Sequence, residues 1–336
     1  MAAPDSELTV AVTGPTGTFG AGLIPLLQAE PRVERIVGVA RRPFDPAERG
    51  WTKMRYRRGD VRDLDDLTAA FRGADVVVHL AFQVVGGGSA EITRAINVDG
   101  TRGAFRAAVA SGVRRFVYAS SVAAYGFHPD NPVGMREDWP IRPAARLFYA
   151  REKAEVERRL WDEAGEHPEV ALYVLRPCIV VGPNAVGAKN LLPDRLAPLA
   201  RRLVTGLRHV PLPVVVPDVP LQLVHERDVG DALCRCVLAA GPPGVYNIAA
   251  DGVVTVAQLL RELGARPITV PSGPVRAAAR ALAAVPFLPP RAQWVEAASQ
   301  PTIMDTSRAK RQLGWQPRYT AEEALRDTVR AWTRTG

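Results

Sequence analysis

The stretch Leu8-Thr9-Val10-Ala11-Val12-Thr13-Gly14-Pro15-Thr16-Gly17-Thr18-Phe19-Gly20 decides the fold. Its first five residues are an apolar run, which is typical of a buried parallel strand. Three glycines follow at a spacing of three, and an apolar helical pattern comes after them. In such a strand–turn–helix, Gly14 allows a tight turn, Gly17 lets the backbone approach a pyrophosphate, and Gly20 lets helix and strand pack closely. The helix N-terminus would face the phosphates with its partial positive charge.

Apolar strand patterns and helical patterns alternate along the rest of the chain. The predicted strands are 36–40, a short third strand before Arg58, 76–81, 116–119, 171–177 and a late strand at 244–248. This alternation indicates a parallel sheet with helices on both faces. We therefore predict an α/β fold, a Rossmann-type doubly wound parallel sheet with a smaller C-terminal substrate-binding lobe. The dinucleotide-binding domain is expected at 1–181, with 222–250 returning to it; 182–221 and 251–336 are expected to form most of the lobe.

Several polar or small residues fall where predicted strands end. They are Gly14, Arg41, Asp60, Ala81 and Ser121. The carboxyl ends of parallel strands share one edge of a sheet, and ligands of open α/β folds bind there. We expect Asp60 to meet an adenine edge and the helix at 96–101 to open beside this edge. Residues 182–220 are Pro-rich and are expected to be irregular.

Arg41 and Arg42 follow the second predicted strand, where NAD-binding folds commonly carry an acid for the ribose 2′-hydroxyl. An arginine suits the 2′-phosphate of NADP instead. The pattern favours NADP over NAD; the alternative is that both side chains are simply solvated at a strand end.

Tyr149 and Lys153 are four residues apart in a helical pattern, so they share one helix face. Only four of the 43 basic residues are lysines, and one is Lys153. A neighbouring ammonium favours the phenolate, whose ordinary pKa is near ~10. A downward shift of about three units requires roughly 4 kcal/mol of differential stabilisation. We expect Lys153 and a bound cationic ring to supply it.

Composition restricts the partners. The formal net charge is +8, but the arginines are scattered in pairs without a long basic run, which argues against nucleic acid. The three cysteines cannot form a disulfide framework, and the five histidines show no metal-ligand spacing. There is no signal-peptide pattern and no apolar run of spanning length. We predict a cytoplasmic protein with a small-molecule substrate, no metal and no stable membrane insertion. The apolar stretch 275–290 is expected to be a lid helix or a dimer contact.

These segments together resemble the extended short-chain dehydrogenase/reductase family, the NAD(P)-dependent epimerase/dehydratase group. The matching motifs are Thr13–Gly20, Asn97–Thr101, Ser120–Gly126, Tyr149-x-x-x-Lys153, Leu175–Pro177, His225–Val229, Tyr246–Ile248 and Leu313–Trp315. Segments 120–139 and 148–158 are most similar to a subgroup labelled UDP-glucose 4-epimerase-like.

The resemblance implies roles for individual residues. Tyr149 would be the acid/base, Lys153 would hold ribose hydroxyls and lower the pKa of Tyr149, Ser121 would bind the substrate oxygen, and Asn97 would support a proton relay. The implied cofactor-binding residues are Gly14, Thr16, Gly17, Thr18, Phe19, Gly20, Arg41, Arg42, Asp60, Val61, Leu80, Ala81, Phe82, Asn97, Ala119, Tyr149, Lys153, Pro177, Cys178 and Ile179. The implied substrate-binding residues are Ser121, Val122, Asn190 and Gln222. A homodimer is also implied.

Two departures from the family pattern concern the substrate. Sugar-nucleotide members usually have Asn where this chain has Ile179, and an Arg where it has 220–223. A diphosphate without these donors would be poorly held. The first hypothesis is therefore an NAD(P)-dependent oxidoreductase acting on a secondary alcohol or ketone. The second is a nucleotide-sugar 4-epimerase with tightly held NAD, and the third is a non-catalytic NADP-sensing protein.

Overall fold

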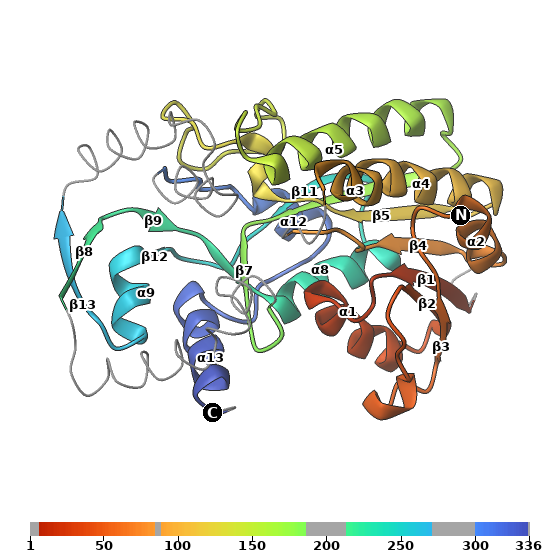
Figure 1. Ribbon diagram of the computed structural model, residues 1–336, viewed down its shortest axis with the longest axis horizontal. Coiled ribbons are helices and arrows are strands. Elements are labelled where there is room, and N and C mark those ends of the chain that lie inside the picture. The colour runs from red at the N-terminus through yellow and green to blue at the C-terminus, as the bar shows by residue number, and fades with distance from the viewer. Residues whose placement is uncertain (1–6, 85–88, 186–212, 271–299, 335–336) are drawn as a thin grey trace.

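The computed structural model describes residues 7–84, 89–185, 213–270 and 300–334. Its elements in chain order are β1 Leu8–Thr13, α1 Thr18–Ala29, β2 Val33–Ala40, η1 Pro46–Arg49, β3 Met54–Arg58, α2 Leu64–Phe71, β4 Val76–His79, α3 Ala90–Arg94, η2 Ala95–Asp99, α4 Gly100–Ala110, β5 Arg115–Ala119, η3 Val122–Tyr125, α5 Phe148–Glu166, β6 Ala171–Pro177, β7 Ile179–Val181, β8 Pro213–Pro217, β9 Pro220–Leu221, β10 Leu223–His225, α8 Glu226–Val237, β11 Gly244–Ile248, β12 Val254–Thr255, α9 Val256–Glu262, β13 Arg266–Val270, α12 Ser307–Gln312 and α13 Ala321–Arg334 (Figure 1).

The centre of the molecule is a seven-stranded sheet of order β11-β6-β5-β4-β1-β2-β3. Every pair in it is parallel, so all seven carboxyl ends lie at one edge. All six residues of β1 are buried, as its apolar run predicts. The chain moves outward from β1 in both directions, which places the switch point of the sheet between β1 and β4. The predicted Rossmann-type α/β fold is confirmed.

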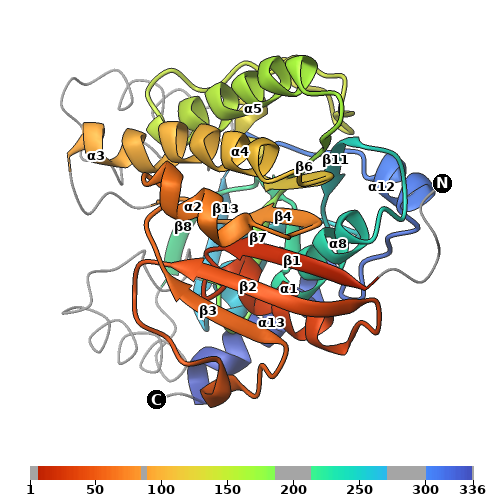
Figure 2. The same cartoon turned by 90° about the vertical axis from the view of Figure 1, so that its right-hand side faces the viewer.

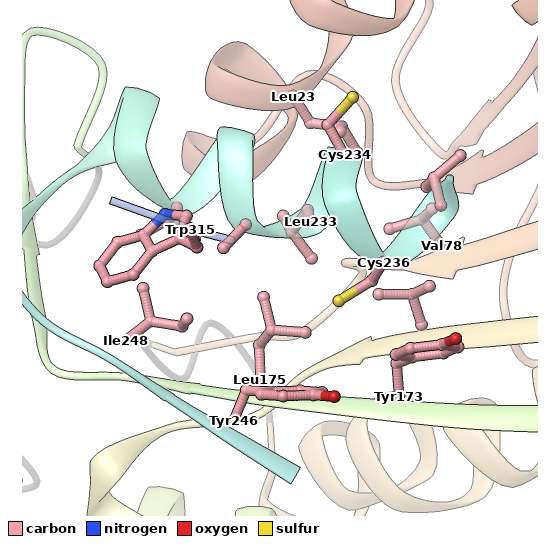
Figure 3. Close-up of a cluster of buried hydrophobic side chains, with 14 of the residues drawn as sticks. Leu23, Val78, Tyr173, Leu175, Leu233, Cys234, Cys236, Tyr246, Ile248 and Trp315 are labelled. Carbon is pink, nitrogen blue, oxygen red and sulfur yellow. The ribbon is translucent and has the colours of Figure 1, made fainter. Parts of the chain in front are cut away.

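Helices cover both faces of this sheet (Figures 1 and 2). Side chains of α2, α4 and α5 form one buried apolar cluster with the sheet, and those of α1, α8 and α12 form the other. Figure 3 shows the second cluster, in which Leu233 and Cys236 of α8 face Leu175 of β6 and Trp315 lies beside the same helix. The thiols of Cys234 and Cys236 lie on opposite sides of α8. The chain returns to the sheet after α8, where β11 pairs in parallel with β6.

Glycines set the distance between α1 and α8. A Cβ on Gly22 would overlap the carbonyl oxygen of Glu226, and one on Gly230 would overlap the backbone of Gly22. The two helices therefore meet backbone to backbone, a contact that sequence periodicity did not reveal. Gly20 was predicted to pack the helix on the strand; a Cβ there would instead overlap the carbonyl oxygen of Pro15. Gly20 therefore closes the turn itself.

A smaller group of elements lies beside the sheet (Figure 1). Strands β8 and β13 pair in parallel, and β9 pairs with β12. Helix α9 packs on both pairs, and α13 packs on α9 and β10, with Val254, Ala324 and Leu325 in their shared apolar cluster. The prediction that 182–220 is irregular was wrong at its end, because the three consecutive valines 214–216 form β8. The segments 186–212 and 271–299, which include Asn190 and the apolar stretch 275–290, lie outside the described residues.

The helix expected to open at residue 96 begins earlier. It starts at Ala90, with the Ser89 hydroxyl accepting from the Ile92 amide at 3.3 Å. It then widens into a π-helical turn at Ala95–Asp99 before α4. Ser89 is therefore the N-cap that the sequence prediction missed. Asn97 lies in the π-helical turn, a feature often found at functional sites.

Candidate active site

The glycine-rich turn lies at the switch point of the sheet. Gly14 has φ +68°, and a Cβ there would lie 3.1 Å from the amide nitrogen of Ala81, beyond β4. Only glycine fits this crossing without strain. Gly17 is the N-cap of α1, no side chain caps it, and the first turn of α1 carries no acid. The helix N-terminus can therefore receive phosphate oxygens, so the turn fits a dinucleotide. Thr18 donates to the carbonyl oxygen of Asn184 at 3.2 Å.

A buried histidine connects this turn to the helix that carries Asn97. The Thr101 hydroxyl uses its one proton on the Asn97 carbonyl at 2.6 Å, so His79 Nε2 must donate to Thr101 Oγ1 at 3.1 Å. His79 Nδ1 then accepts from Thr13 Oγ1 at 2.9 Å. Burial lowers the pKa of His79 to about 3, so the ring is neutral and the tautomer is fixed. The sequence analysis did not assign His79 a role.

Tyr149 and Ser121 meet where β5 and α5 approach each other. The Ser121 hydroxyl lies near enough to the Tyr149 phenol to lower its pKa by hydrogen bonding. Ser121 also caps η3 by accepting from the Ala123 amide at 3.2 Å. Burial raises the pKa of Tyr149, and the Ser121 hydrogen bond only partly opposes this. In the chain by itself, desolvation of the phenol therefore opposes the predicted lowering of the Tyr149 pKa. The prediction itself also invokes a bound cationic ring, and it stays a prediction.

Lys153 is 2% exposed and shares the helix face of Tyr149. Its ammonium donates to the Tyr118 hydroxyl at 3.2 Å and to the Ala119 carbonyl at 2.7 Å. Burial lowers the pKa of Lys153 to about 7, although Glu157 and Glu152 on the same helix raise it. At neutral pH, Lys153 is therefore protonated in only part of the molecules. Tyr118 is a site residue that the sequence analysis missed; a polar aromatic in an otherwise apolar buried strand was the available signal.

Asn97 is buried and its amide is fully used. It accepts from the Gln83 amide at 2.7 Å, donates to the Gln83 carbonyl at 3.0 Å, and donates to Glu152 at 2.7 Å. Asn97 therefore fixes the segment after β4 and ties it to α5, one residue before Lys153. Burial raises the pKa of Glu152.

A buried charged network joins α5 to the sheet at β6. Arg176 of β6 donates to both carboxylate oxygens of Glu157, at 2.6 to 3.1 Å, and to the Tyr125 hydroxyl at 2.7 Å. Ser120 donates to Glu157, and Tyr125 donates to Asn247 of β11 at 2.9 Å. Arg176 is 3% exposed and Glu157 is fully buried, so each charge needs the other. The sequence treated 175–177 only as a motif; an arginine in a buried strand already requires a carboxylate partner.

The other predicted site residues fall into three groups. Those at strand ends are placed at the carboxyl edge: Thr16, Phe19, Leu80, Ala81, Phe82, Val122, Pro177, Cys178 and the 47% exposed Ile179. The Arg41 and Arg42 side chains are exposed, and Arg58 Nε donates to the Arg41 carbonyl at 3.0 Å. Asp60 is paired with Arg62 at 2.7 Å, which lowers the pKa of Asp60, and Val61 packs near Gly100.

Gln222 is hydrogen-bonded to the backbone of a distant residue. Its amide donates to the Met304 carbonyl at 3.0 Å and accepts from the Met304 amide at 2.8 Å. These two bonds tie the segment before β10 to residue 304, and the predicted substrate contact of Gln222 stays a prediction. Among the described residues, no group of three or more His, Cys, Asp or Glu side chains is placed to hold a metal. No helix within the described ranges is long and apolar enough to cross a membrane.

A doubly wound sheet with these side chains at its carboxyl edge is the arrangement of a dinucleotide-binding enzyme. The model of the NAD dependent epimerase/dehydratase family matches residues 10–249. The chain belongs to this family, which is part of the extended short-chain dehydrogenases/reductases, and it is an enzyme of that kind.

The similar proteins carry names that denote different activities, and some are uncharacterized. An uncharacterized protein of Mycobacterium tuberculosis is 30% identical over 97% of this chain and 85% of its own length. The UDP-glucose 4-epimerase of Vibrio cholerae is 26% identical over 96% of this chain and 95% of its own. Sterol demethylase protein B of Methylococcus capsulatus is 33% identical over 52% of each chain. Among solved structures, MoeE5 in complex with UDP-glucose and NAD is 26% identical, with a TM-score of 0.68 and coverage of 97% and 99%.

Proposed function

We propose that the protein is an NAD(P)-dependent oxidoreductase that transfers hydride to or from the carbon of a secondary alcohol or ketone, with Tyr149 as the proton donor and acceptor. The observation that carries this proposal is the placement of Ser121 and Tyr149 at one site beside the buried ammonium of Lys153, which lies 5.9 Å from the centroid of the Tyr149 ring. Two hydroxyls that share one site can both contact one substrate oxygen, which is the arrangement needed where charge develops on that oxygen.

The chain's own residues divide the proton chemistry. A phenol with a raised pKa is neutral at pH 7, so Tyr149 is in the form that donates a proton to a carbonyl oxygen. Ser121 donates to the same oxygen as it becomes negative. Lys153 then offsets the charge of the tyrosinate. In the oxidative direction the steps reverse, and the phenol must first lose its proton. The bound nicotinamide supplies or accepts the hydride.

The cofactor would lie along the carboxyl edge. Gly14, Gly17 and the N-terminus of α1 would hold the diphosphate, and Lys153 would hold ribose hydroxyls. Arg41 and Arg42 are exposed at the end of β2, where their guanidinium groups would bind a 2′-phosphate. We propose that NADP is preferred over NAD. The predicted homodimer, the division into domains and the cytoplasmic location stay predictions.

A nucleotide-sugar 4-epimerase is the second candidate. It is supported by the whole-length similarity to the Vibrio cholerae UDP-glucose 4-epimerase and by the likeness to MoeE5 with UDP-glucose and NAD. Exposed Ile179 argues against it, since its side chain offers a diphosphate no donor, and Gln222 already directs one amide proton and its amide oxygen to the backbone of Met304. The partial similarity to sterol demethylase protein B supports an apolar alcohol or ketone instead.

One experiment separates the candidates. The purified protein is given UDP-glucose without added cofactor, and in parallel a panel of secondary alcohols and ketones with NADPH or NADH. Cofactor oxidation or reduction with a panel member supports the oxidoreductase. Formation of UDP-galactose without added cofactor supports the epimerase, and would overturn the first proposal. Tyr149→Phe should abolish turnover while Tyr173→Phe, the same change outside the site, should not.

A further inference from the structure

Phe82 contacts both members of the proposed acid–base pair. The Lys153 ammonium lies 3.6 Å from the centroid of its ring. The ring of Tyr149 meets it edge to face, with centroids 5.6 Å apart and planes at 87°. An ammonium at this position over a ring face is attracted by the ring's quadrupole. One side chain thus touches the two groups whose relative position the chemistry requires.

The position of this ring is fixed from both sides. On the N-terminal side, the amides of Leu80 and Ala81 donate to Thr13 Oγ1 at 3.2 and 3.3 Å. On the C-terminal side, Gln83 is held through both backbone groups by the Asn97 amide. The backbone that carries Phe82 is therefore tied to β1 and to the helix of Asn97. The backbone contacts therefore fix where the Phe82 ring enters the site.

We propose that Phe82 is a positioning residue: its ring face holds the protonated Lys153 ammonium, and its edge-to-face contact with the Tyr149 ring orients the phenol. This inference rests on the proposed function and extends it from a predicted cofactor contact to the control of the lysine's charge. Within the part of the chain that the structure describes, the Lys153 ammonium donates hydrogen bonds to a phenol and to one carbonyl, and the ring is an additional neutral group that favours its charged form.

The charge of Lys153 is sensitive to such a contact. The titratable groups that face it are Glu152, Glu157 and Tyr149 on α5, Tyr118 on β5 and His79 on β4. The pKa of His79 is about 3 and those of both tyrosines are raised, so these three groups stay neutral around pH 7. The pKa of Lys153 itself is about 7, so a change in its stabilisation alters the charged fraction within the working range.

The test measures cofactor affinity against pH by fluorescence titration, which needs no substrate. Affinity should decline as pH rises through the pKa of Lys153, and Lys153→Met should remove this decline. Phe82→Leu keeps an apolar side chain of similar size without a ring. It should move the decline in cofactor affinity to lower pH by about 0.4 to 1.5 units. This shift is the ~0.5 to 2 kcal/mol of a cation–π contact, converted at about 1.4 kcal/mol per pKa unit.

Two further variants make the result decisive. Phe82→Tyr retains a ring face and should keep the decline within a few tenths of a pH unit of the wild type. Phe44→Leu is the same substitution beside Trp51, away from Lys153. It should leave the pH at which cofactor affinity declines unchanged. An unchanged decline in Phe82→Leu, or an equal shift in Phe82→Leu and Phe82→Tyr, would overturn the role of Phe82. Absence of cofactor binding, or of any decline that depends on Lys153, would instead refute the proposed function.

Discussion

Replacing Lys153 by Met should make the protein more stable while removing its activity. Burial lowers the pKa of Lys153 from 10.5 to about 7, so folding opposes the charged form. At about 1.4 kcal/mol per unit, this difference of about 3.5 units costs roughly 5 kcal/mol of unfolding free energy below pH 7. Methionine has a similar reach and no charge, but it leaves the Ala119 carbonyl without its donor, a loss of about 1–3 kcal/mol. The expected net gain is about 2–4 kcal/mol.

The pH dependence gives this prediction its sign. Between pH 7 and about 10 the unfolded chain binds a proton that the folded Lys153 has released, so wild-type stability rises with pH by about 1.4 kcal/mol per unit. The advantage of the variant should therefore shrink from pH 7 to pH 9 by roughly 3 kcal/mol. Urea unfolding followed by tryptophan fluorescence measures both values. Lys53→Met is the control, because Lys53 also donates to a backbone carbonyl, that of Glu30 at 2.8 Å, from a partly exposed position. A less stable Lys153→Met variant at pH 7, or a difference independent of pH, would refute the reasoning.

Three other variants test the histidine, the 2′-phosphate and the buried ion pair. Wild-type stability should fall by about 1.4 kcal/mol per pH unit below pH 6.5, because His79 is protonated in the unfolded chain but not in the folded chain, where its pKa is about 3. His79→Gln should flatten this slope, as measured by urea unfolding at pH 7 and pH 5. Arg41→Asp with Arg42→Ser should weaken NADPH binding by at least about tenfold and NADH binding much less, measured by fluorescence titration. Glu157→Gln should lower the unfolding free energy by about 3–5 kcal/mol, because it leaves Arg176 buried without its counter-charge.

Matched variants interpret these results. Glu155→Gln breaks partly exposed pairs with Arg94 and Arg159 and should cost about 1 kcal/mol for each pair at most, because solvent screens both. Arg57→Ser removes an exposed β3 arginine that is paired with Asp66, and should affect NADPH and NADH equally. Equal NADPH and NADH titrations before and after the Arg41 and Arg42 changes would remove the 2′-phosphate argument. A Glu157→Gln variant as stable as Glu155→Gln would show that Arg176 finds another partner, and an unchanged slope in His79→Gln would assign the acid sensitivity to other groups.

The sheet could be predicted because its strands are short apolar runs, buried on both faces. In β1, β6 and β11 the expected ranges agree with the structure to within a residue. Contacts between distant segments could not be read in this way. Nothing in the sequence places Gly230 against Gly22, because backbone contact between helices leaves no periodic signal. The early start of the helix before Asn97 was missed because one capping serine, rather than an apolar repeat, determines it.

Within the site, the pairing of Tyr149 with Lys153 followed from helical spacing, but the electrostatics did not. A pKa depends on the burial of a group and on every neighbour, and Phe82, Tyr118 and Glu157 come from three different elements. The bonds of Gln222 to the backbone of Met304 could not be read from the sequence either, because the two residues are far apart along the chain.

The most direct test of the central claim is a pH titration of tyrosinate absorbance, in wild type and Tyr149→Phe, with and without bound oxidised cofactor. Without cofactor, the Tyr149 phenol should titrate above its ordinary pKa near ~10, as its burial requires. With the cationic ring bound beside Lys153, the wild type should gain one tyrosinate at a distinctly lower pH, and Tyr149→Phe should lack it. Identical titrations of the two bound proteins would contradict the assignment of Tyr149 as the acid–base group.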